Sequence, residues 1–499
     1  MTYDLYNQYK EITQKAADFN YAAAVLGWDQ EVYMPTKGFP YRGRQLATLA
    51  TQAHELLTSE AYGSMLQELA GSNDLNEEQQ NNIRLSLEDF EKNRKLSSDF
   101  VEKLTQQTSN SYSAWIEARK RNDFSVYAPE LEKMLALKKE QAQLYGYDSH
   151  PYDALLDDYE KGATVAMLDP IFSKVKEELS PLIKQIRQGE QVNDDFFNKG
   201  FERQKQFDFS LEVLRRMGYD FEGGRQDYSE HPFTTSFAPT DVRVTTRVDE
   251  NDLASLLWSS IHEGGHALYE QGLREDQYGM PLGAAVSLSI HESQSRLWEN
   301  CVGRGLPFWK FFLPVLKQRF LEQLKNVAPE DIYIAANRVS SSLIRTEADE
   351  LTYHFHVMIR YEIEKLLISG EIRTKDLAGI WNEYYQKYLG VSSPDDLQGV
   401  LQDVHWSHGS FGYFPTYSLG SFYAAQFFEQ ARKDINGLQD QITNGDFKEL
   451  LSWLRQNIHQ YGRRFRSEEL CNRITGRGLD FASFMKYATE KYTSIYKLT

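Results

Sequence analysis

The alternation of apolar and polar residues predicts helices along most of the chain. Between Lys92 and Leu144, apolar side chains recur three or four positions apart, as the buried stripe of an amphipathic helix requires. Proline is scarce, with 14 residues in 499, so few of these helices are interrupted. The same spacing marks four further segments, Pro170 to Gln188, Phe311 to Leu324, Ala335 to Leu367 and Phe447 to Arg463. We therefore expect a mainly α-helical fold.

Two segments depart from this helical pattern. Thr234 to Val248, TTSFAPTDVRVTTRV, is rich in threonine and valine and partly alternates with period two, which predicts a short hairpin or sheet edge. Gly399 to Gly420 is dense in glycine, histidine and aromatic residues, a composition typical of a turn-rich loop over a site. No internal repeat or linker is present, so residues 1–499 are predicted to form a single domain with one small β element.

Charge and composition narrow the classes of function. The net charge of −17 argues against a nucleic-acid partner and against attraction to an anionic membrane. No stretch approaches eighteen uninterrupted apolar residues, and the polar N-terminal segment does not match a signal peptide. The only two cysteines, Cys301 and Cys471, favour a reducing compartment. Together these features predict a cytoplasmic protein without a membrane span.

The stretch SSIHEGGHALYEQ, Ser259 to Gln271, contains the strongest chemical signal in the chain. His262 and His266 are one helical turn apart, so both imidazoles can reach one ion. Glu263 lies beside them and can accept a proton from a water molecule. This is the H-E-x-x-H pattern of zinc peptidases, in which the glutamate is the general base.

Gly264 and Gly265 stand between the two histidines and need a separate explanation. Each costs about 1 kcal/mol against alanine inside a helix. A purely structural helix would gain nothing from them, whereas close approach of another helix or of substrate would require them. The glycines therefore favour the metal-site interpretation over a helix that merely contains two histidines.

Zinc requires a third protein ligand and an open position for water. The next candidate segment is HESQSRLWEN, which begins at His291, and either His291 or Glu292 could supply the ligand. Glu292 is preferred if the site is similar to the zinc peptidases that take a glutamate from a following helix. In those enzymes an aspartate often follows one turn later, where this chain has Arg296. Glu299, two turns on, is the candidate partner for a ligating histidine.

Several motifs in register resemble the thermostable-carboxypeptidase family, the carboxypeptidase Taq-like (M32) metallocarboxypeptidases. They run in the expected order over nearly the whole chain, which makes the resemblance more specific than H-E-x-x-H alone. The matching blocks are WDQEVYMP (Trp28 to Pro35), DVRVT (Asp241 to Thr245), HESQSR (His291 to Arg296), IRTEADE (Ile344 to Glu350) and GVLQDVHW (Gly399 to Trp406).

The resemblance implies a large helical peptidase with a long central groove that holds the metal, similar to neurolysin-like and converting-enzyme-like zinc peptidases. It implies metal ligands His262, His266 and Glu292, with zinc expected first and cobalt second. It also implies a homodimer that acts on peptides with a free C-terminus and releases single amino acids.

A carboxypeptidase must recognise the free carboxylate of its substrate, which a guanidinium does best through paired hydrogen bonds. Arg345 in IRTEADE is the first candidate, and Arg243 in DVRVT is the second. Each has a structural alternative. Arg243 could pair with Asp241, and Arg345 could pair with an acidic neighbour: Glu347, Asp349 or Glu350.

Peptide hydrolysis also needs a donor that stabilises the oxyanion. The aromatic loop offers His405, His408, Tyr413 and Tyr417, of which Tyr413, with His405, is preferred. Each could instead be a packing residue. Two other functions stay open: an oligopeptidase or dipeptidase with the same ligands, and a peptide-binding protein that keeps the metal without catalysis.

Overall fold

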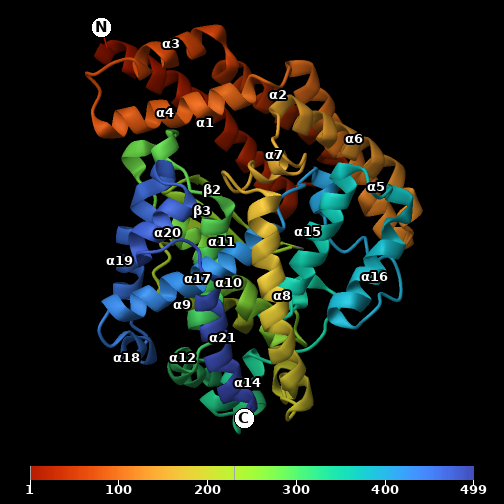
Figure 1. The fold of residues 1–499 in the computed structure, drawn as a ribbon. Helices are drawn as coiled ribbons and strands as arrows, with labels where there is room; N and C mark the ends of the chain where they lie inside the picture. Colours follow the sequence, from red (N-terminus) through yellow and green to blue (C-terminus); the bar gives the residue numbers. More distant parts are fainter. Residues whose placement is uncertain (1, 230, 499) are drawn as a thin grey trace. The chain divides into compact units, whose positions relative to one another are not determined.

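The computed structural model describes residues 2–229 and 231–498 and separates the chain into two compact units. Unit 1 consists of Met1–Asn93, Val192–Asn337 and Gly420–Ser483, and unit 2 of Arg94–Gln191, Arg338–Leu419 and Phe484–Thr499. The predicted architecture is confirmed, because the described residues are mainly helical with one small sheet (Figure 1). In the described residues, no helix combines the length and the apolar character needed to span a membrane.

Unit 1 contains the sheet and the greater number of the helices. Its helices are α1 (Thr2–Val32), α2 (Phe39–Thr58), α3 (Glu60–Ala70), α4 (Glu77–Asn93), α9 (Arg203–Met217), α10 (Leu253–Glu270), α11 (Leu288–Arg296), α12 (Leu306–Arg319), α13 (Leu321–Leu324), α14 (Pro329–Ala336), α18 (Leu438–Thr443), α19 (Lys448–Asn457) and α20 (Ser467–Thr475). Most of α17 (Pro415–Asp434) also belongs to it. A π-helical stretch, Leu297–Gly303, continues directly from α11.

The sheet of unit 1 has three strands in the order β1-β3-β2. β2 (Thr234–Ala238) and β3 (Asp241–Thr246) pair antiparallel and form the expected hairpin. β1 (Gly224–Tyr228) lies parallel to β3 and was not predicted, because its sequence GRQDY is polar and lacks an apolar alternation. The side chain of its buried Gln226 bonds α9, where Nε2 donates to Ser210 Oγ at 2.9 Å.

Helix α10 is surrounded by other elements of unit 1. It packs against α9, α11 and the strands β2 and β3 (Figure 1). Its predicted apolar stripe is buried, and consists of Leu256, Leu257, Ile261, Leu268 and Tyr269. The side chain of Asp252 caps the first turn by accepting hydrogen bonds from the backbone N–H groups of Ala254 and Ser255. This helix is therefore fixed both at its start and along its length.

Unit 2 is helical throughout its regular structure. Its helices are α5 (Ser98–Arg121), α6 (Ala128–Tyr145), α7 (Asp153–Leu156), α8 (Val165–Gln188), α15 (Tyr353–Ser369), α16 (Leu377–Leu389) and most of α21 (Phe481–Tyr496). The predicted helical stretch from Lys92 to Leu144 forms α5 and α6, separated where Asn122 takes a left-handed conformation, with φ of 53°.

One predicted helix is wrong over part of its length. Within the segment from Ala335 to Leu367, the chain is irregular between α14 and α15. The carboxylate of Asp349 accepts hydrogen bonds from the backbone N–H groups of Ser340, Leu351 and Thr352, which replaces the helical pattern there. The predicted loop from Gly399 to Gly420 is irregular only as far as Phe414, because α17 begins at Pro415.

Candidate metal centre

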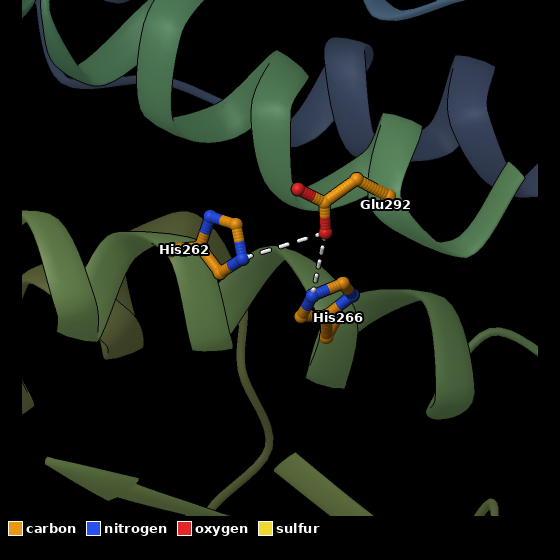
Figure 2. A group of neighbouring side chains, drawn as sticks. All are labelled: His262, His266 and Glu292. Atoms are coloured by element: carbon orange, nitrogen blue, oxygen red, sulfur yellow. Dashed lines mark ion pairs between the residues drawn. The ribbon is translucent and has the colours of Figure 1, made fainter. Parts of the chain in front are cut away.

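Two helices of unit 1 place three donor side chains together. His262 and His266 project from one face of α10, and Glu292 projects from α11, whose first turn is capped by Ser287 (Figure 2). Glu292 Oε2 lies 3.6 Å from His262 Nε2 and 3.4 Å from His266 Nε2. All three donor atoms lie within 4.8 Å of one another. We call these three residues the donor group.

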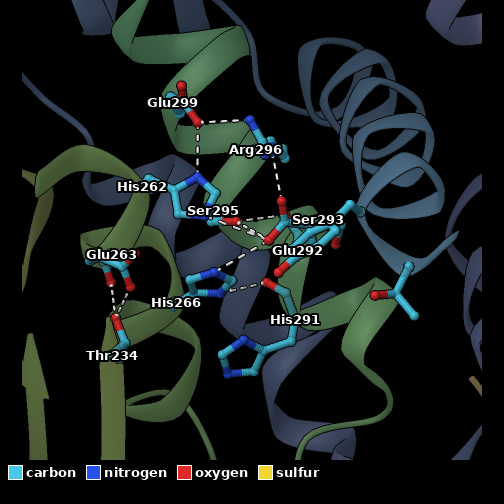
Figure 3. Close-up of polar contacts among 12 residues, drawn as sticks. Thr234, His262, Glu263, His266, His291, Glu292, Ser293, Ser295, Arg296 and Glu299 are labelled. Atoms are coloured by element: carbon cyan, nitrogen blue, oxygen red, sulfur yellow. Dashed lines mark hydrogen bonds and ion pairs between the residues drawn. The ribbon is translucent and has the colours of Figure 1, made fainter. Parts of the chain in front are cut away.

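The far side of each imidazole has its own partner. His262 Nδ1 lies 2.8 Å from Glu299 Oε2, and His266 Nδ1 lies 3.0 Å from the carbonyl oxygen of His291 (Figure 3). Both acceptors require Nδ1 to carry the hydrogen, which leaves the Nε2 lone pair directed at the centre of the group. The predicted partnership of Glu299 with a histidine is therefore present.

His291 and Glu292, the two candidates for the third donor, differ in these contacts. His291 supports His266 through its backbone, while its side-chain Nε2 lies 2.8 Å from Glu270 Oε1. Glu292 has one oxygen on the donor group and the other on Arg296, whose Nε donates at 2.6 Å. The carboxylate, not the imidazole of His291, completes the donor group.

The donor group fits a divalent metal. Its N···O distances of 3.4 and 3.6 Å are longer than good hydrogen bonds, so the three atoms surround a point instead of bonding one another. Two imidazole nitrogens and a carboxylate oxygen are ligands that zinc and cobalt accept. Among the described residues this is the one group of its kind with three converging donors.

Neighbouring charges oppose the effect of burial on the pKa values of two members of the donor group, His262 and Glu292. Burial by itself lowers the pKa of His262, but the carboxylates of Glu292 and Glu299 outweigh it and raise that pKa. Burial likewise favours the neutral acid at Glu292, yet Arg296 and the two histidines hold its pKa well below the usual range. The carboxylate is therefore charged and ready to ligate a cation.

Glu263 lies beside the donor group and has a separate support. Thr234 of β2 donates from Oγ1 to Glu263 Oε2 at 2.7 Å and also lies 2.9 Å from the Glu263 carbonyl oxygen (Figure 3). Burial raises the pKa of Glu263. A raised pKa brings a carboxylate closer to the range in which it can accept and return a proton near neutral pH.

The two glycines of the motif are explained by helix packing. A Cβ on Gly265 would lie 2.6 Å from the Cα of Ser295 and 2.8 Å from the carbonyl oxygen of Gln294, both in the backbone of α11. A Cβ on Gly264 would meet the side chain of Leu214 in α9 at 2.4 Å. Gly265 thus allows α10 and α11 to approach closely enough for Glu292 to join the histidines.

Arg243 is in unit 1, and its pairing is the structural alternative foreseen for it. Its Nε and Nη2 each donate to the carboxylate of Asp241 at 2.9 Å. The guanidinium also lies over the rings of Trp28 and Phe237, at 4.5 and 4.9 Å from their centroids. Two of its nitrogens are therefore engaged within its own strand.

Arg345 is in unit 2 and pairs with a residue that was not foreseen. Its Nε and Nη2 lie 3.0 and 2.9 Å from Asp403 Oδ1, while Arg360 Nε donates to the other oxygen at 2.6 Å. Two of the three predicted neighbours are used elsewhere, since Asp349 caps the backbone and Glu350 pairs with Lys491. We call Arg345, Arg360 and Asp403 the Arg345 cluster.

Charge distinguishes the two arginine environments. In the Arg345 cluster two guanidinium groups share one carboxylate, and they hold the pKa of Asp403 well below its usual range although burial opposes this. Asp403 lies within the GVLQDVHW block and could have been suspected from its sequence position. Arg360 could not, because only the fold brings it to Asp403.

His405 and Tyr413 lie together in unit 2, beside the Arg345 cluster. His405 Nε2 lies 2.9 Å from the hydroxyl of Tyr417, whose ring is 4.9 Å from the Arg345 guanidinium. The ring of Tyr413 contacts those of His405 and Tyr417 at 5.3 and 5.1 Å. Burial, followed by the charge of Arg345, lowers the pKa of His405 to about 3, so its imidazole is neutral at pH 7.

One buried carboxyl anchors the loop that carries these residues. Glu364 of α15 accepts hydrogen bonds from the indole Nε1 of Trp406 at 2.7 Å and from the backbone N–H of Gly412 at 2.9 Å. It also bonds the hydroxyl of Tyr152. Burial raises the pKa of Glu364 to about 7. Sequence reasoning missed this residue, since nothing in its surroundings on α15 marks it.

Comparison with known proteins agrees with these motifs. The sequence model of the carboxypeptidase Taq (M32) metallopeptidases matches residues 8–492. The chain belongs to this family. It is 37% identical to carboxypeptidase 1 of Bacillus subtilis over 98% of each chain, and 40% identical to thermostable carboxypeptidase 1 of Thermus thermophilus over 98% of this chain and 99% of that one.

The fold agrees with the sequence comparison. The crystal structure of an M32 carboxypeptidase from Deinococcus radiodurans has a TM-score of 0.95 to this chain at 40% identity, covering 99% of this chain and 100% of that one. The resemblance drawn from the sequence motifs is thereby confirmed. The chain with the sequence printed above is therefore a metal-dependent carboxypeptidase, and its substrates are peptides.

Proposed function

We propose that His262, His266 and Glu292 bind one zinc or cobalt ion, and that Glu263 is the general base. The reaction is the release of single amino acids from peptide C-termini. The observation that carries this proposal is the convergence of three donor atoms. The other polar atom of each of these side chains, Nδ1 in both histidines and Oε1 in Glu292, is hydrogen bonded to a neighbour. When bound, the metal supplies Lewis acidity towards water and the peptide carbonyl.

Glu263 supplies the proton transfer in this proposal. Its carboxylate accepts a proton from the attacking water and delivers it to the leaving amine. The hydrogen bond from Thr234 fixes one carboxylate oxygen, Oε2, at 2.7 Å. A protein that only stored metal would not need a buried carboxylate beside the donor group, so Glu263 favours catalysis over the non-catalytic alternative.

Substitution of Glu263 by glutamine tests this role. We expect Glu263→Gln to retain the metal and to lose about 10²–10⁴-fold in kcat. Glu270→Gln is the matched control, because Glu270 is on the same helix but pairs with His291. Metal content by elemental analysis and peptide turnover are measured together. Undiminished turnover in Glu263→Gln contradicts the assignment.

We propose further that Arg345 binds the substrate carboxylate, with Arg243 as the second candidate. Charge supports this order. The Arg345 cluster has a surplus guanidinium, whereas Arg243 is matched by Asp241. Tyr413, with neutral His405, is proposed to stabilise the oxyanion, because both carry N–H or O–H donors beside this cluster.

Arginine substitutions separate these candidates. Arg345→Met should lower kcat/KM for peptides with a free C-terminus by about 10–100-fold, through the loss of hydrogen bonds to a charged group. The fold should survive, because Asp403 keeps Arg360 at 2.6 Å. Arg243→Met is the matched comparison. A larger loss in Arg243→Met than in Arg345→Met reverses the assignment.

The whole chain is proposed to act as one peptidase domain in a cytoplasmic homodimer. The continuous family match over residues 8–492 supports a single functional domain. The chain has only two cysteines, Cys301 and Cys471, and so low a number supports a reducing compartment. Sedimentation of the purified protein tests the dimer, and a monomer at micromolar concentration contradicts it.

A further inference from the structure

The two oxygens of Glu292 face different partners. Oε2 faces the two histidines of the donor group, at 3.6 and 3.4 Å from their Nε2 atoms. Oε1 accepts a hydrogen bond from Arg296 Nε at 2.6 Å. The Glu292 side chain is only 5% exposed, so solvent scarcely competes for either oxygen.

Arg296 also reaches the residue that supports His262. Its Nη1 lies 3.3 Å from Glu299 Oε2, and the same oxygen lies 2.8 Å from His262 Nδ1. One guanidinium therefore links Glu292, a member of the donor group, to Glu299, which supports a second member (Figure 3). The contacts follow from the helix, since Arg296 is four residues after Glu292 and three before Glu299.

The Glu292 side chain has little room to turn. A Cβ on Gly420 would lie 2.5 Å from the Glu292 Cγ and 2.6 Å from its Cβ, so the backbone of α17 closes against it. Ser295 Oγ, which donates to the Glu292 carbonyl oxygen at 2.8 Å, lies 3.3 Å from Oε2. These contacts fix the stem of Glu292, so rotation of the carboxylate about its last bond is the freedom left for Arg296 to restrict.

We propose that Arg296 is a positioning residue that restricts Glu292 to one coordinating oxygen. A carboxylate can bind a metal through one oxygen or both. A charge-assisted hydrogen bond at 2.6 Å draws Oε1 away from the centre. A catalytic metal needs three protein ligands and an open position, which a second glutamate oxygen would fill. This inference rests on the proposed function, because it takes the donor group as the metal site.

Cobalt(II) bound to the full-length protein tests the proposal, because its visible absorption weakens as the coordination number rises. Arg296→Met removes the guanidinium and lets both Glu292 oxygens turn to the metal. We expect weaker cobalt bands and a kcat lower by about 10–100-fold. Arg304→Met is the matched control, since Arg304 bonds Glu299 Oε1 at 2.8 Å. Its cobalt bands should keep the wild-type intensity.

The conservative variant Arg296→Lys keeps the positive charge and should restore most of the band intensity. If Arg296→Met does not fold, Arg296→Gln, which also lacks the charge, takes its place. Wild-type band intensity in the uncharged variant, with only weaker cobalt binding, overturns the proposal. Failure of the wild-type protein to bind cobalt, or unchanged binding in His266→Ala, contradicts the metal site itself. The two failures are therefore distinguishable.

Discussion

Around the donor group of unit 1, Arg296 and Arg304 pair with Glu292 and Glu299, and a third carboxylate, that of Glu263, is bonded by Thr234 and by neither arginine. In the Arg345 cluster of unit 2, two guanidinium groups share the single carboxylate of Asp403. The surplus charge is negative in the first region and positive in the second. The first suits a cation, and the second suits the carboxylate of a peptide C-terminus.

The two regions also differ in how they are built. The donor group comes from two capped helices, and its two histidines lie at a helical spacing that sequence alone shows. The Arg345 cluster joins an irregular turn, the helix α15 and a loop, and its central pair, Arg360 and Asp403, is separated by 43 residues. Helix geometry brings the two histidines of the donor group together, whereas tertiary packing brings the residues of the Arg345 cluster together.

The largest effect is expected from a substitution that disrupts the Arg345 cluster and leaves the donor group intact. Asp403→Asn removes the shared carboxylate and leaves two buried guanidinium groups uncompensated. We expect the free energy of unfolding to fall by about 3–5 kcal/mol. Denaturant unfolding measures the loss, and elemental analysis below the transition should still find metal. An unfolding free energy within 1 kcal/mol of wild type would contradict the role of Asp403.

The second prediction concerns the carboxyl that anchors the loop of unit 2. The folded-state pKa of Glu364, about 7, is above its ordinary value of 4.5. Its stabilising effect is therefore complete below pH 4.5 and is lost as pH rises through 7. Between pH 5 and pH 8, wild type should lose about 2–3 kcal/mol relative to Glu364→Gln, which cannot ionise. A difference that stays constant with pH would contradict the raised pKa.

The third prediction concerns the close packing of α10 against α11 in unit 1. Gly265→Ala places a Cβ against the backbone of α11, so α10 and α11 must move apart. We expect a loss of about 1–3 kcal/mol in the free energy of unfolding, together with weaker metal binding. Gly264→Ala is the control, because its Cβ meets the movable side chain of Leu214. Equal metal affinity in both variants would contradict the packing argument.

These differences explain how far sequence reasoning could reach. The helical fold and the hairpin follow from residue spacing, and so does the pairing of His262 with His266 on one helix. Glu292 was preferred over His291 only through the similarity to zinc peptidases that take a glutamate from a following helix. The pairing of Arg345 with Asp403 was missed, since Asp403 is 58 residues away in the sequence, while the nearby Asp349 and Glu350 bind other partners. β1 was missed because its residues are polar, and its buried Gln226 bonds Ser210 of α9 in place of apolar packing.

The smallest expected effect concerns the hydroxyl that orients Glu263. Thr234→Val removes the donor at 2.7 Å while keeping the shape of the side chain. We expect kcat to fall by about 3–10-fold, the value of one typical protein hydrogen bond, with KM unchanged. Thr234→Ser keeps the hydroxyl and should recover most of the activity. If the serine variant is as slow as the valine variant, the methyl group and not the hydroxyl matters.

The most direct test of the central claim is mass spectrometry of the products from one peptide in two forms, with a free C-terminus and with a C-terminal amide. A cation site at the donor group and a surplus guanidinium at Arg345 predict stepwise loss of single residues from the free acid, with the amide left intact. Equal cleavage of both forms, or cleavage at internal bonds, would contradict the account.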